Sequence, residues 1–155
     1  MLIFIAIKDV NKLKITFEDL SKELKSKNIR LSHQRLKVLE YVAKHRCHPT
    51  VEQIYNDLHE EIPTLSKTTI YNTLKTLVEA GMVKQLTIED NEARYDINIE
   101  THGHFKCESC GAIYDFEINI DSFDCKELEG FKINHKDVYF RGICQKCINH
   151  NNKSN

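Results

Sequence analysis

Two pairs of cysteines constrain this chain of 155 residues more than any other feature. Cys107 and Cys110 form one Cys-x-x-Cys pair, and Cys144 and Cys147 form a second pair. Two intervening residues form a tight turn that lets both thiolates of a pair bind the same ion. Together, the four thiolates match the tetrahedral preference of structural zinc. A thioredoxin-like redox pair, or thiols placed by chance, would not explain two matched pairs. We therefore predict one structural zinc ion per subunit, bound by these four cysteines.

A second group of candidate ligands lies just before the first cysteine pair. His102 and His104 alternate, so on a strand both side chains face the same side. Asp96 precedes them, Asp115 follows them, and His48 lies far away in the N-terminal half. Imidazole and carboxylate ligands together suit Fe(II), Mn(II) or Zn(II). Each residue taken alone fits equally well as a surface or core histidine or as a turn-capping aspartate, but the grouping favours a metal site.

The N-terminal half has the spacing of a small helical unit. Apolar residues recur at helical intervals over 17–24, 32–43, 51–58 and 67–80. Ser32, Thr50 and Ser66 are suited to cap the last three helices, and Gly81 supplies a left-handed stop. The period then changes to two, which predicts a hairpin over 85–97 with an acidic turn at 89–92. Short helices followed by a hairpin describe a winged helix.

The last of these helices presents a polar stripe on the side opposite its apolar face. The stripe consists of Thr68, Tyr71, Asn72 and Lys75, whose hydroxyl, amide and ammonium groups can hydrogen-bond base edges and phosphates in a major groove. Residues 1–85 carry 14 basic and 10 acidic side chains, a net charge of +4. A plain solvated helix face would look the same, so the pattern favours DNA binding without requiring it.

Composition excludes several other classes of protein. Hydrophobic residues make up 41% and charged residues 29% of the chain, as in globular proteins. The longest apolar run, Met1 to Ile7, is far short of the roughly 20 residues of a membrane span. We therefore expect a soluble, cytoplasmic protein with no membrane partner. Because the cytoplasm is reducing, its six cysteines indicate metal binding rather than disulfides.

An enzyme is not expected. The chain lacks a Gly-rich phosphate loop, a Gly-x-Ser-x-Gly motif, and the His-x-Glu and Pro-Cys-x-x-Cys motifs of zinc deaminases. We expect no small organic substrate. A plain zinc-ribbon interaction module is the other alternative, but it would not need the helical half.

The C-terminal half is predicted to be a small α+β unit. Strand-like stretches cover 105–106, 112–118 and 131–140, and a helix is expected over 122–128. The polar tail over 149–155 is expected to fray.

Taken together, these motifs resemble the ferric uptake regulator (Fur) superfamily. The resemblance covers residues 17–148 and is carried by positions 31–35, 48–50, 66–74, 81–83, 94–96, 102–104 and the two cysteine pairs. It implies an α+β fold with an N-terminal winged helix-turn-helix DNA-binding domain and a C-terminal α/β dimerisation domain containing the four-cysteine zinc site. The implied boundaries are 1–96 for the first domain, with 1–12 as an extension outside the family pattern. This domain is followed by a hinge at 97–101, the dimerisation and zinc domain at 102–150 and a frayed tail at 151–155.

Within the family, the chain most resembles the peroxide-sensing PerR branch. The regulatory metal site of that branch falls here on His48, Asp96, His102, His104 and Asp115, whereas iron sensors usually have Glu at the position of Asp96. The resemblance implies one regulatory Fe(II) or Mn(II) per subunit, with ligands from both domains. Peroxide would oxidise His48 and His102 and release the repressor from DNA. The alternative is an iron, zinc or manganese uptake regulator that responds to the level of metal.

The resemblance also implies partners and DNA contacts. A homodimer would bind a palindromic, A·T-rich double-stranded operator. The contacting residues would be Arg30 in a minor groove, Tyr71 and Asn72 on bases, and Lys67, Thr68 and Lys75 on phosphates. Cys47 and Cys125 match neither cysteine pair. Cys47, next to His48, is a bystander or a redox-active thiol, of which we favour the bystander, and His135 is left outside the main site.

Overall fold

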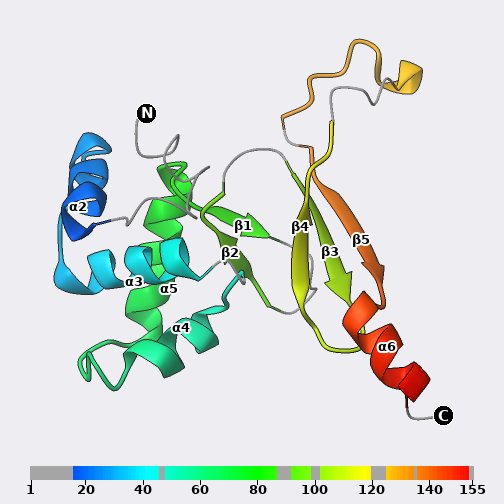
Figure 1. Ribbon diagram of the computed structural model, residues 1–155. Coiled ribbons are helices and arrows are strands. Elements are labelled where there is room, and N and C mark those ends of the chain that lie inside the picture. Colours follow the sequence, from blue (N-terminus) through cyan, green and yellow to red (C-terminus); the bar gives the residue numbers. More distant parts are fainter. Residues whose placement is uncertain are drawn as a thin grey trace. The chain divides into compact units, whose positions relative to one another are not determined.

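The computed structural model describes residues 16–45, 48–86, 92–98, 102–119, 125–134 and 136–153, and of 151–153 the backbone alone (Figure 1). The chain divides into two compact units, Met1–Ile99 and Glu100–Asn155. The extension 1–12, Cys47, the acidic turn except Glu92, and His135 lie outside the described residues, and the expected hinge is described only at Ile97 and Asn98. No helix in the described ranges has the length and apolar character needed to cross a bilayer.

Among its described residues, the first unit consists mostly of four helices. They are α2 (Phe17–Ser26), α3 (His33–Lys44), α4 (Val51–Leu58) and α5 (Lys67–Glu79). The Ser32, Thr50 and Ser66 side chains each accept a hydrogen bond from the backbone N–H three residues on, which confirms the three predicted caps. The Gln53 side chain also accepts from the Thr50 N–H, completing the predicted capping box.

Two helices end in a left-handed residue. Gly81 has φ 66°, and the next N–H, of Met82, donates to the carbonyl of Leu77. The predicted stop at Gly81 is therefore confirmed. Asn28 has φ 57° at the end of α2, and the N–H of Ile29 donates to the carbonyl of Leu24 in the same way. Both ends satisfy carbonyl groups that the last turn of a helix would otherwise leave unpaired.

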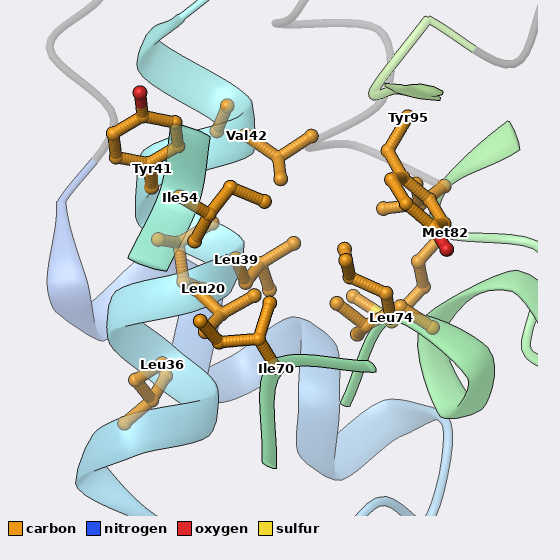
Figure 2. Packing of buried hydrophobic residues seen from close by; sticks show 14 of the residues in the cluster. Leu20, Leu36, Leu39, Tyr41, Val42, Ile54, Ile70, Leu74, Met82 and Tyr95 are labelled. Atoms are coloured by element: carbon orange, nitrogen blue, oxygen red, sulfur yellow. The ribbon is translucent and has the colours of Figure 1, made fainter. Parts of the chain in front are cut away.

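The apolar stripes of the helices meet in one core. Figure 2 shows Leu39 of α3, Ile54 of α4, and Ile70 and Leu74 of α5 packed together, and all four are at most 1% exposed. Complete burial of one such side chain contributes about 1.5–3 kcal/mol. Because α5 buries this stripe against α3 and α4, its opposite face is left exposed.

The first unit ends in a short antiparallel pair of strands. Strand β1 (Lys84–Leu86) pairs with β2 (Arg94–Asp96), with Gln85 opposite Tyr95. The predicted hairpin is confirmed for these positions, and its tip at 87–91 lies outside the described residues. Residues 49 and 50 also lie along β2, because the Tyr95 N–H donates to the Pro49 carbonyl and Thr50 forms an isolated bridge with Arg94.

The second unit is built on a three-stranded sheet. Strand β3 (Gly103–Cys107) is central, antiparallel to β4 (Ile113–Phe116) and parallel to β5 (Val138–Gly142). A 3-10 turn, η2 (Lys126–Leu128), lies between β4 and β5, and helix α6 (Gln145–Lys153) follows β5 (Figure 1). The α+β class and the two-part architecture are as predicted.

Three local predictions for this unit differ from the structure. The strand expected over 131–140 begins only at Val138. Strand-like residues form a strand only where a neighbouring strand offers hydrogen bonds, and the exposed residues 131–134 pair with none of the described strands. Within the expected helix over 122–128, the described residues form one 3-10 turn. Helix α6 reaches Lys153 and so covers part of the expected frayed tail. Its first hydrogen bond, from the Ile148 N–H to the Cys144 carbonyl, starts the helix at a cysteine of the first predicted site.

Candidate metal centres and nucleic-acid interface

The four predicted zinc ligands come together at one end of the second sheet. Cys107 is the last residue of β3, and Cys110 lies on the turn into β4, which Gly111 completes with φ 71°. Cys144 and Cys147 flank the start of α6, just after β5. Because β3 and β5 run parallel and are paired as far as their last residues, the two cysteine pairs meet.

The thiol geometry fits a tetrahedral zinc ion. The Sγ atoms of Cys107 and Cys147 are 3.9 Å apart, as are those of Cys110 and Cys144, and all four lie within 4.8 Å of one another. Four sulfur atoms, each about 2.3 Å from one zinc ion, are expected about 3.8 Å apart. With four protein ligands such a site is closed, as in structural rather than catalytic zinc sites. The thiolate cluster is therefore a structural zinc site.

At Cys107 and Cys144, hydrogen bonds favour the thiolate form that zinc requires. The Cys144 N–H donates to Cys107 Sγ over 3.3 Å, and this and further backbone N–H groups lower the pKa of Cys107 to about 6. The backbone N–H of Cys147 and the side chain of Tyr114 both form hydrogen bonds with the Cys144 thiol and lower its pKa. The same bond raises the pKa of Tyr114 to about 12. Tyr114 was missed in the sequence, where nothing but its place on a strand beside the cluster marks it.

The second unit also contains a nitrogen and oxygen cluster. His102 immediately precedes β3, His104 lies on β3, and Asp115 on β4 is directly opposite His104. Asp115 Oδ1 is 3.6 Å from His102 Nε2 and 3.7 Å from His104 Nε2. These separations exceed a hydrogen bond. They are close to the roughly 3.0–3.6 Å expected between two ligands that are each about 2.1 Å from one ion.

This donor set accepts a wider range of metal ions than the thiolates do. Two imidazoles and a carboxylate suit Fe(II), Mn(II) or Zn(II), and four thiolates suit zinc. Tyr139 of β5 lies beside the cluster, with its ring centroid 5.7 Å from that of His104. The sequence did not mark Tyr139, because only the pairing of β5 with β3 brings it there.

The first unit brings the two remaining predicted ligands together. His48 Nε2 is 3.6 Å from Asp96 Oδ2, and both residues are buried. His48 has φ 51°, an uncommon backbone conformation for a residue other than glycine. Arg94 Nη1 donates to the His48 carbonyl over 3.3 Å, and the Asn98 N–H donates to Asp96 Oδ1 over 2.8 Å. Strand β2 thus positions both members of the pair.

The exposed face of α5 contains most of the predicted DNA contacts. Its members Lys67, Thr68, Tyr71, Asn72 and Lys75 are all exposed, and Tyr71 retains 56% of its accessible surface. Lys67 Nζ lies 2.5 Å from Glu52 Oε2 and 5.2 Å from the centroid of the Tyr55 ring. The remaining predicted contact, Arg30, is exposed in the turn between α2 and α3. Cys125 is exposed and belongs to neither cluster.

A winged-helix unit joined to a sheet unit with a thiolate cluster and an imidazole–carboxylate cluster defines a metalloregulator. The chain belongs to the ferric uptake regulator family, which it matches over residues 26–141. The resemblance inferred from the sequence motifs is therefore confirmed.

Relatives of the chain include proteins named for their response to peroxide. It is 37% identical to the peroxide operon regulator of Bacillus subtilis over 127 residues, which are 80% of this chain and 88% of that protein. It is 32% identical to the peroxide-responsive repressor PerR of Staphylococcus aureus over 142 residues, 90% of this chain and 96% of that one. The ferric uptake regulator of Helicobacter pylori shares the fold with a TM-score of 0.70, at 22% identity, over 88% of this chain and 97% of that one.

Proposed function

We propose that this chain is a dimeric, metal-dependent transcriptional repressor that binds palindromic, A·T-rich operators and senses hydrogen peroxide. The observation that carries the proposal is the pair of chemically distinct clusters on strand β3, thiolates at its end and imidazoles at its start. Relatives at 37% and 32% identity, named as peroxide regulators, support the same function. The function is regulatory rather than catalytic.

The regulatory site of the proposal combines ligands from both units. His48 and Asp96 join His102, His104 and Asp115 around one Fe(II) or Mn(II), as the family resemblance implies. With ligands from both units, occupancy of the site restrains their relative orientation. In a dimer, that orientation sets the distance between two recognition helices, which must match successive major grooves about one helical turn apart. Metal binding therefore favours the DNA-binding state by its differential affinity for that state.

The response to peroxide depends on the imidazole ligands. Fe(II), when bound, would lend one electron to begin cleavage of the O–O bond of hydrogen peroxide and would regain it from the imidazole. One peroxide oxygen is inserted at the Cε1–H of His48 or His102, and the other leaves as water. The imidazole loses the two electrons that the peroxide gains. The resulting 2-oxo-imidazole has hydrogens on both ring nitrogens, so it is a poor metal ligand. Without the metal, the relative orientation of the two units is no longer restrained, and the repressor leaves the DNA.

The DNA contacts of the proposal lie mainly on α5. Tyr71 and Asn72 contact bases, while Lys67, Thr68 and Lys75 contact phosphates, and Arg30 enters a minor groove. The burial of the opposite apolar face of α5 supports this assignment, because a helix anchored in the core presents its polar face in one orientation.

Peptide mass spectrometry tests peroxide sensing. The zinc-bound protein is loaded with Fe(II), treated with stoichiometric peroxide and digested. We expect one added oxygen on the peptide containing His102, His48 or both, and none in protein loaded with Mn(II). The peptide containing His33, an exposed histidine outside both clusters, serves as an internal control for unselective oxidation. Unmodified histidines with intact Fe(II) binding would overturn peroxide sensing by this route.

An uptake regulator that responds to metal level is the second candidate, because the same donor set also accepts Zn(II) and Mn(II). A gel shift with palindromic A·T-rich DNA, with and without Mn(II), tests the shared part of both proposals. Absence of a shift in both conditions would overturn both. Addition of peroxide to the Fe(II) complex separates them, since only a peroxide sensor releases the DNA while iron remains in excess.

A further inference from the structure

We infer that Gly103 and Phe116 are a positioning pair that holds Asp115 opposite His104, an inference that rests on the proposed regulatory metal site. Gly103 on β3 is paired with Phe116 on β4, and the next pair along is His104 with Asp115. The Phe116 ring occupies the space above Gly103. A Cβ atom at Gly103 would lie 2.2 Å from Cζ and 2.4 Å from Cε2 of that ring.

The pairing of β3 with β4 decides which face of the sheet Asp115 occupies. Side chains alternate between the two faces, so His104 and Asp115 share one face, and Gly103 and Phe116 share the other. A slip of one residue would move Asp115 to the face opposite His104. Asp115 retains 38% of its accessible surface, so burial does little to restrain it. Its contact with both histidines therefore depends on the register.

Packing on the opposite face specifies that register. The Phe116 ring stacks on Phe140 of β5, with centroids 5.1 Å apart and planes inclined by 18°. Phe140 is paired with Phe105, two residues after Gly103 on β3. One aromatic ring thus contacts the central strand at its glycine and packs on the strand beyond it. An aromatic ring laid over a cross-strand glycine is a known way to fix strand pairing.

Glycine is needed at position 103 for space. The left-handed residues in the described ranges are Asn28, His48, Gly81, Gly111 and Gly130, so Gly103 is in a conformation open to any residue. Every larger side chain would force the Phe116 ring away. The expected consequence is displacement of β4, and with it of Asp115, relative to His102 and His104.

The test measures Mn(II) affinity of zinc-loaded full-length variants, using the electron paramagnetic resonance signal of free Mn(II). We expect Gly103→Ala to raise the Mn(II) dissociation constant about 10-fold or more, as removal of an outer partner of a metal ligand does. The double variant Gly103→Ala with Phe116→Ala should bind Mn(II) more tightly than Gly103→Ala alone, because the clash is absent, but less tightly than the unsubstituted protein, because the ring that specifies the register is absent too. Gly142→Ala is the matched control, since a Cβ there would lie 3.4 Å from the Phe105 ring, an ordinary contact.

Zinc content and thermal midpoint, measured on the same samples, separate positioning from general damage. A raised Mn(II) dissociation constant with retained zinc, relieved in the double variant, supports the inference. Equal Mn(II) affinity for Gly103→Ala and the unsubstituted protein would overturn it, as would a double variant no better than the single one. Asp115→Asn separates failure of the positioning pair from failure of the proposed metal site. If that variant binds Mn(II) normally, the proposed regulatory site itself is wrong.

Discussion

Arg94 donates a hydrogen bond from its guanidinium group to the backbone carbonyl of His48, 46 residues earlier in the chain. Asp96, two residues after Arg94 on the same strand, faces the His48 ring. The strand therefore holds the histidine by its backbone and meets its side chain with a carboxylate.

Replacement of Arg94 by Ala should weaken binding of the regulatory metal. Without the guanidinium, the left-handed backbone at His48 loses one of its restraints, and we expect a rise of about 10-fold in the Mn(II) dissociation constant. Titration of the zinc-loaded protein measures this. Gln85→Ala, at an exposed position on the neighbouring strand, should leave the constant unchanged. Equal affinities for both variants would show that Arg94 does not position His48.

Replacement of Cys107 by Ser should abolish zinc binding. Zinc capture contributes on the order of 10–16 kcal/mol in zinc-finger peptides. Three strands of four or five residues cannot replace that contribution. We expect loss of one zinc per chain and loss of the folded second unit, measured by metal analysis and circular dichroism. Cys125→Ser is the matched control, since this exposed thiol lies outside the cluster, and it should retain its zinc. A folded Cys107→Ser protein without zinc would contradict a structural role for the ion.

Truncation of Leu74 to Ala should destabilise the first unit by about 2–5 kcal/mol, the usual cost of a cavity at a fully buried leucine. Glu79 lies on the same helix at an exposed position, so Glu79→Ala is the control. It should change the free energy of unfolding by no more than about 0.5 kcal/mol. Urea denaturation followed by circular dichroism measures both. Similar midpoints for the two variants would mean that α5 does not depend on the core it contacts.

Replacement of Lys67 by Met should weaken operator binding and lower the slope of log affinity against log salt concentration by about 1, the change expected for one phosphate contact. The pairing of Lys67 with Glu52 suggests the opposite effect for Glu52→Gln, since the carboxylate competes with phosphate for the ammonium group. Gel shifts or fluorescence anisotropy at several salt concentrations measure the slopes. Lys44→Met removes another exposed lysine that is also paired with a glutamate, outside the proposed contacts, and should leave the slope unchanged. An unchanged slope for Lys67→Met would remove Lys67 from the DNA interface.

The sequence alone was enough to predict the features that depend on neighbouring residues. A cap at Ser66, a capping box at Thr50 and a left-handed stop at Gly81 each involve atoms no more than five residues apart. The apolar stripe of α5 was predicted for the same reason, because helical spacing is a local property. Cysteine spacing also identified the zinc site, because a Cys-x-x-Cys turn brings two ligands together wherever its partner pair lies.

The tertiary structure decided everything that depends on strand pairing. The strand-like stretch 131–140 was predicted to be one strand, but pairing with β3 begins only at Val138, and no local pattern says where a partner strand starts. Placement of Asp115 opposite His104 likewise depends on register, which the ring of Phe116 over Gly103 specifies from the other face of the sheet. The ligand types could be listed from the sequence because their chemistry belongs to single residues. Their geometry could not, because it is set by contacts between residues far apart in the chain.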